Sequence, residues 1–88
     1  MMLPTDYSII RESAQAFATK AIEMGYWLTP NNHVGTPDAA RLMGITPGHM
    51  RNLISQGKGP PQHGGGGGFK KTVSLLDLAE WDYSRRHG

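Results

Sequence analysis

A chain of 88 residues with a formal net charge of +2 and 38% hydrophobic residues has room for one domain with a single modest core, because a chain of this size buries only about 60% of the surface that it exposes when unfolded. The absence of cysteine excludes a disulfide framework and a thiolate metal site, and no apolar stretch approaches the length that would cross a membrane. The first residues lack the basic and apolar regions of a signal peptide, so we expect a cytoplasmic protein without a membrane partner.

The charge is unevenly divided along the chain. Residues 1–35 contain two basic and three acidic side chains, whereas residues 36–88 contain seven basic and four acidic ones. A basic segment favours a polyanionic partner. Any nucleic acid is therefore expected to bind the C-terminal part.

The first expected element is a helix from Asp6 to Met24, capped by Asp6 or Ser8 and stopped by Gly25. Apolar residues spaced by three and four lie on one face of this helix: Ile10, Ala14, Phe17, Ala21 and Met24. The simplest expectation is that this face packs on the rest of the chain. Self-association and the binding of another protein are the alternatives.

A connector of turn formers follows at residues 29–32. Tyr26 and Trp27 precede it and are expected to pack in the core or against the helix rather than to contact a ligand. Residues 1–33 are therefore predicted to form an N-terminal helix and connector, residues 34–84 the domain that binds the nucleic acid, and residues 85–88 a frayed tail.

The next segment predicts two short helices joined by a tight turn. Thr36 is expected to cap a helix that begins at Pro37 and ends at Gly44, and Thr46 to cap a second helix that ends at Gly57. Two helices joined in this way form a helix-turn-helix arrangement.

The second of these helices has two different faces. The apolar residues of this region are Ile45, Met50, Leu53 and Ile54, and the polar or small ones are Gly48, His49, Arg51, Asn52 and Ser55. A polar helix face is most often simply solvated. Arginine and asparagine, however, can make bidentate contacts with guanine and adenine edges in the major groove, and a glycine at the helix entry would let the backbone approach DNA closely.

A hairpin is predicted after the two helices. Two prolines at positions 60 and 61 impose an extended path, and residues 69–73 form a short strand in which Phe69, Lys71 and Val73 share one side. Pairing with Gln62 and His63 would leave the five glycines as the tip. A disordered linker is the plain alternative for these glycines.

The last expected element is a helix capped by Ser74, with Asp77 three residues later as in a capping box. Its core candidates are Leu75, Leu78, Ala79 and Trp81. The complete prediction is a mainly α chain with a small β-hairpin wing: a winged helix-turn-helix preceded by an extra N-terminal helix.

In order and spacing, residues 34–83 resemble the MerR-like winged helix-turn-helix domain of phage and mobile-element excisionases and related small regulators. The segment from Val34 to Thr46 looks like the first helix and turn of that family, and Pro47 to Gly57 looks like its recognition helix. Residues 59–61 resemble the turn into the wing, and residues 74–81 are similar to the closing helix with its Asp-Leu-x-x-Trp signature.

The resemblance implies that the second helix enters the major groove while the wing lies along the adjacent backbone or minor groove. The expected DNA contacts are Thr46, Gly48, His49, Arg51, Asn52, Ser55, Lys58, Gly66, Lys70 and Lys71. Wings of this family usually carry several arginines, whereas this one has two lysines. We therefore expect the wing to add salt-dependent affinity with little base specificity, and expect low affinity per monomer.

The resemblance predicts a sequence-specific protein that binds double-stranded DNA, acting as an excisionase (recombination directionality factor) or as a small transcriptional regulator. Its partners would be an integrase or recombinase in the first case and a second copy, through the N-terminal helix, in the second. The alternatives are the DNA-recognition domain of a phage terminase small subunit and a protein–protein module on the same fold.

Enzymatic activity, a metal and a cofactor are not expected. The four histidines, His33, His49, His63 and His87, lack the spacing of metal ligands, and capping or solvation explains the carboxylates. His49 is a candidate DNA contact whose charge would increase below neutral pH.

Overall fold

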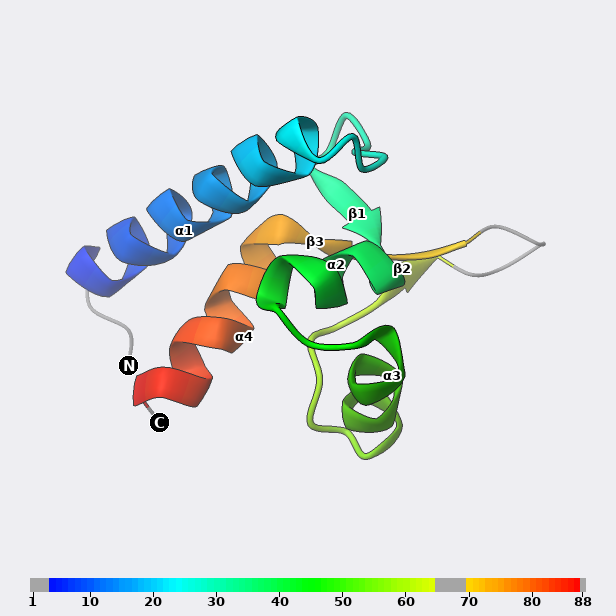
Figure 1. Cartoon of the computed structure of the whole chain (residues 1–88). Coiled ribbons are helices and arrows are strands. Elements are labelled where there is room, and N and C mark those ends of the chain that lie inside the picture. Colours follow the sequence, from blue (N-terminus) through cyan, green and yellow to red (C-terminus); the bar gives the residue numbers. More distant parts are fainter. Residues whose placement is uncertain (1–3, 65–69, 88) are drawn as a thin grey trace.

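The computed structural model describes residues 4–64 and 70–87 (Figure 1). Its elements, in chain order, are α1 (Pro4–Glu23), β1 (His33–Gly35), α2 (Thr36–Met43), α3 (Pro47–Ser55), β2 (His63–Gly64), β3 (Lys71–Ser74) and α4 (Leu75–His87). The expectation of a mainly helical chain with a small antiparallel sheet is confirmed. Helix α4 continues through Arg85 and Arg86, which belong to the expected frayed tail.

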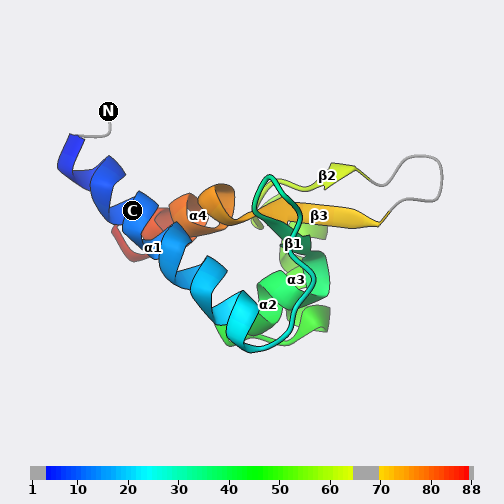
Figure 2. The ribbon, with the colours of Figure 1, turned by 90° about the horizontal axis from the view of Figure 1, so that it is seen from above.

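Helix α1 lies alongside α4, as Figures 1 and 2 show from two directions. The residues of α1 that are buried here are Ile10, Ala18 and Ala21. Met24, expected on the same face, lies beyond the helix and is 57% exposed. The predicted packing of this apolar face within the chain is therefore confirmed.

A hydrogen bond joins the outer ends of these two helices. Tyr83 Oη donates to Asp6 Oδ1 at 2.5 Å, and this hydrogen bond raises the pKa of Tyr83 above the ordinary value of 10.0. Because the neutral phenol is the favoured form, the contact stabilises the fold below pH 10 and loses its effect as the pH rises through the raised pKa.

The sheet has three antiparallel strands in the order β1-β3-β2. The predicted hairpin is confirmed, with His63 opposite Thr72 and Gly64 opposite Lys71. The pairing of β1 with β3 was not predicted. Strand β1 has only three residues, too few to show an alternating pattern, and Val34 is buried opposite Val73.

The turn between α2 and α3 follows the predicted chemistry. Gly44 ends α2 with a φ of 74°, a conformation that glycine adopts without steric cost. The Thr46 side chain accepts a hydrogen bond from the His49 backbone N–H at 3.1 Å and so caps α3, as predicted. The prediction that Thr36 caps α2 is wrong. Gly35 is the N-cap residue and has no side chain to make a capping hydrogen bond, and the Thr36 hydroxyl is hydrogen-bonded to the hairpin.

The core lies between the α1–α4 layer, the sheet and the α2–α3 pair. Its largest fully buried side chains are Ile10, Val34, Met50, Val73, Leu75 and Leu78. Trp81, predicted to be a core residue, is only partly buried against this cluster. Its Nε1–H donates to the Lys58 carbonyl at 2.8 Å and so ties α4 to the segment that follows α3.

The start of the hairpin is packed closely against α3 at Gly59. A Cβ atom at this position would lie 2.6 Å from Ile54 Cγ1 and 2.9 Å from the Ile54 backbone nitrogen. Both distances are shorter than van der Waals contact, and the backbone atom cannot move away by a change of rotamer. From the sequence, Gly59 is explained only as part of a turn. The structure shows a second reason, which is the close approach of Gly59 to Ile54.

Replacing Gly59 by alanine is therefore expected to destabilise the fold by about 1–3 kcal/mol, as overpacking does. Urea unfolding measures the change. The control is Gly48→Ala, where the added Cβ would meet Arg51 Nη2 at an ordinary 3.7 Å and where alanine favours the helix by about 1 kcal/mol. Equal unfolding midpoints for the two variants would contradict the packing argument.

Candidate nucleic-acid interface

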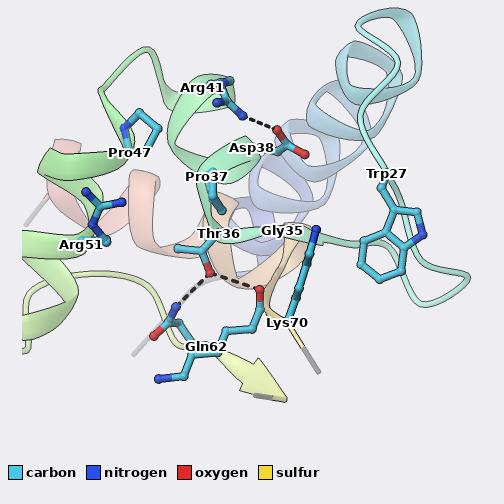
Figure 3. Close-up of a pocket in the computed structure, with 11 residues that line it drawn as sticks. Trp27, Gly35, Thr36, Pro37, Asp38, Arg41, Pro47, Arg51, Gln62 and Lys70 are labelled. Atoms are coloured by element: carbon cyan, nitrogen blue, oxygen red, sulfur yellow. Dashed lines mark hydrogen bonds and ion pairs between the residues drawn. The ribbon is translucent and has the colours of Figure 1, made fainter. Parts of the chain in front are cut away.

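An open groove of about 1090 Å³ lies between the start of α2, α3 and the two arms of the hairpin. Its lining residues are Trp27, Gly35, Thr36, Pro37, Asp38, Arg41, Pro47, Arg51, Gln62, Lys70 and Lys71. In Figure 3, Arg51 lies on one side and Trp27 on the other, with the start of α2 between them. The groove therefore joins segments that are far apart in the sequence.

Hydrogen bonds fix the floor of the groove to the hairpin. Thr36 Oγ1 accepts from Gln62 Nε2 at 2.9 Å and donates to the Lys71 carbonyl at 3.4 Å (Figure 3). One buried hydroxyl thus links the start of α2 to both arms. These bonds set the angle of the hairpin to the α2–α3 pair, and with it the width of the groove.

The groove carries more positive than negative charge. Its charged lining residues are Arg41, Arg51, Lys70, Lys71 and Asp38. Arg41 Nη1 lies 2.7 Å from Asp38 Oδ1, so this carboxylate is already paired with a cation. Within the described part of the chain, Arg51, Lys70 and Lys71 form no ion pair. Three cationic side chains are thus available to an anionic ligand.

The structure divides the expected DNA contacts into three groups. Arg51, Lys70 and Lys71 line the groove, and all three are exposed. The other described candidates lie outside the lining: Thr46, Gly48, His49, Asn52, Ser55 and Lys58. Gly66 lies outside the described residues, as do most of the glycines of the expected tip.

The candidates outside the lining are still on or next to α3. His49, Asn52 and Ser55 are exposed on the helix, on the side away from the buried Met50. The predicted division of α3 into a polar and an apolar face is confirmed, since Leu53 and Ile54 are partly buried. A duplex laid against α3 would meet these polar side chains together with Arg51.

The lining residues that were not predicted from the sequence include Arg41, Gln62 and Trp27. Arg41 could have been found, because it is the one basic residue of α2 and its spacing of three from Asp38 keeps it on an exposed face. Gln62 gave no signal beyond its place in the hairpin. Trp27 was expected to pack in the core or against the helix. It is 61% exposed, so the expectation of a core position is wrong.

Two histidines with no apparent relation in the sequence lie together on the sheet. The ring centroids of His33 and His63 are 5.0 Å apart, with His33 Nδ1 3.0 Å from Thr72 Oγ1 and His63 Nε2 3.0 Å from Asp77 Oδ2. This cluster connects all three strands with α4 and so helps to hold the hairpin in place. The cluster lies on one face of the sheet, and the buried Val34 and Val73 lie on the other face.

Residues 4–64 and 70–87 contain no group of three His, Asp or Glu side chains arranged to hold a metal ion. None of the helices in these ranges combines the length and the apolar character needed to cross a membrane. Comparisons of the chain with protein-family models, with curated proteins and with solved structures give no match.

Proposed function

We propose that this protein binds double-stranded DNA in a sequence-specific manner, with the groove between α2, α3 and the hairpin as its DNA-binding surface. The observation that carries the proposal is that Arg51, Lys70 and Lys71 line one open groove and form no ion pair with the residues that the structure describes. Arg51 comes from a helix, and the two lysines come from an arm of the hairpin. A polyanion that is wide enough to contact both elements is the ligand that this arrangement favours.

The proposed arrangement is a winged helix-turn-helix. Helix α3 would enter the major groove, where Arg51 and Asn52 have the side chains suited to guanine and adenine. The β2–β3 hairpin would act as the wing and contact the phosphate backbone through Lys70 and Lys71.

The biological role that fits this proposal is that of a phage or mobile-element excisionase or of a small transcriptional regulator. An excisionase would bind adjacent direct repeats beside an integrase or recombinase. A regulator would bind an inverted repeat as two copies. Because α4 covers the apolar face of α1, a partner would contact the exposed side of α1, which carries Ile9 and Ile22.

Selection from a pool of random DNA duplexes at moderate salt tests this proposal. Sequencing of the retained duplexes is expected to give an enriched motif, and the order of its repeats then separates the two roles. If duplexes are retained without an enriched motif, the protein binds the DNA backbone without sequence specificity, as in DNA packaging. No retention even at low salt would exclude DNA as the ligand.

Replacing Lys70 or Lys71 by alanine is expected to weaken binding to all duplexes alike, because a lysine–phosphate contact carries no sequence information. Each lost contact should reduce the slope of log K against log salt by about 0.9. Titration of labelled duplex at several salt concentrations measures this slope. Lys20→Ala is the matched control, since Lys20 is exposed on α1 outside the groove. A slope unchanged from that of the parent protein would show that the hairpin does not contact the DNA.

A further inference from the structure

Trp27 is a large apolar side chain that the packing of this protein does not use. It is 61% exposed, although the neighbouring Tyr26 and Leu28 are partly buried against the core. Within the described residues its indole N–H makes no hydrogen bond. An exposed indole does not gain the favourable free energy of burial. Contact with a molecule outside the chain would supply it.

The backbone on both sides of Trp27 is held in place. The Tyr26 N–H donates to the Ala21 carbonyl at 2.9 Å at the end of α1, and Leu28 forms a bridge with Val34 of β1. The Thr29 N–H then donates to the His33 carbonyl at 2.9 Å. Trp27 is thus presented from a fixed connector, which lowers the entropic cost of using it in binding.

Trp27 lines the same groove as Arg51, Lys70 and Lys71. Figure 3 shows its ring across the start of α2 from Arg51, and the same groove is lined by Lys70 and Lys71. A ligand for this groove must carry negative charge and must also offer an apolar surface to the indole. The sugar–phosphate backbone of DNA has both, since deoxyribose presents an apolar face beside each phosphate, and an indole N–H can donate to a phosphate oxygen.

We infer that Trp27 is a DNA-backbone contact on the side of the groove away from α3. The connector of residues 26–32 then acts as a third DNA-contacting segment, in addition to α3 and the hairpin. This inference rests on the proposed function. It makes Trp27 a source of affinity that depends neither on sequence nor on salt, because the indole is uncharged and touches no base.

The test measures binding of the full chain to a labelled mixed-sequence duplex of about 20 base pairs, two helical turns. Trp27→Ala is expected to weaken binding about tenfold, as loss of a tryptophan anchor does, without changing the salt slope. Trp27→Phe keeps an aromatic ring and is expected to lose less. The control is Leu76→Ala, because Leu76 is 38% exposed on α4 but lies outside the groove, and it should bind as the parent protein does.

Intrinsic fluorescence gives a second measurement that does not depend on affinity. The chain has two tryptophans, and binding of the duplex to the parent protein is expected to quench the emission of the exposed one. In Trp27→Phe, where only Trp81 remains, this quenching should disappear. Both variants are expected to unfold at the same urea concentration as the parent, because the replaced ring is largely exposed.

The outcomes separate this inference from the function on which it rests. If the parent binds the duplex and Trp27→Ala binds it equally well, Trp27 is not a DNA contact and the inference is wrong. A quenching in Trp27→Phe as large as that of the parent protein would also overturn the inference, because Trp27 would then contribute nothing to it. If the parent does not bind the duplex even at low salt, the proposed function itself is wrong.

Discussion

Replacing Arg51 by alanine is expected to weaken binding to the preferred duplex by about 1–3 kcal/mol and to relax the preference at one base position. Arg51 is exposed on α3, lines the groove and forms no ion pair among the described residues. Its planar guanidinium can donate two parallel hydrogen bonds to a guanine edge. Loss of this contact should therefore affect one base pair rather than the whole site.

The measurement is competition binding with the preferred duplex and with duplexes changed at each position in turn. Arg11→Ala removes the same charge from α1, outside the groove, and should retain the full base preference. Lys71→Ala should lose affinity for every duplex alike. An equal loss on preferred and random DNA for Arg51→Ala would mean that Arg51 contacts the backbone and that base recognition lies elsewhere on α3.

Replacing Met50 by alanine is expected to destabilise the protein by about 2–5 kcal/mol. Met50 is fully buried on the inner side of α3, within the cluster that joins the sheet and α4. A chain of this size has a total stability of only about 5–15 kcal/mol, so the variant should lose a large share of its stability. Any loss of DNA binding would then follow from loss of the fold.

Urea unfolding followed by circular dichroism gives this value. The matched control is Met24→Ala, the same substitution at a residue that is 57% exposed, and its effect should stay within about 0.5 kcal/mol. If Met50→Ala unfolds at the same urea concentration as Met24→Ala, α3 is not anchored in the core through Met50. The exposed position of Arg51 and of the other polar side chains of α3 would then lose its basis.

The two faces of α3 could be predicted because local sequence controls them. Thr46 and Pro47 fix where the helix starts, and helical spacing puts Met50 and Ile54 on one side and Arg51 on another. The hairpin was predictable for a similar reason, since two short segments flank a run of glycines. In these elements each residue depends mainly on its near neighbours in the chain.

The groove could not be predicted in this way. Its floor depends on the Thr36 hydroxyl, which has the sequence pattern of a helix cap but is bonded to Gln62 and to the Lys71 carbonyl. Nothing near Thr36 in the chain indicates these partners, because they are 26 and 35 residues away. The contact between His33 and His63 across β3 is hidden for the same reason.

The sequence by itself determined the helices, the cap of α3, the hairpin pairing and the side of α3 that is polar, because hydrophobic spacing and capping act over a few residues. Only the tertiary structure decided that β1 joins the sheet, that Gly59 packs against Ile54, and that Arg41 and Trp27 line the same groove as Arg51. These features depend on contacts between distant segments, and such contacts exist only after the core has formed around Met50, Val73 and Leu78.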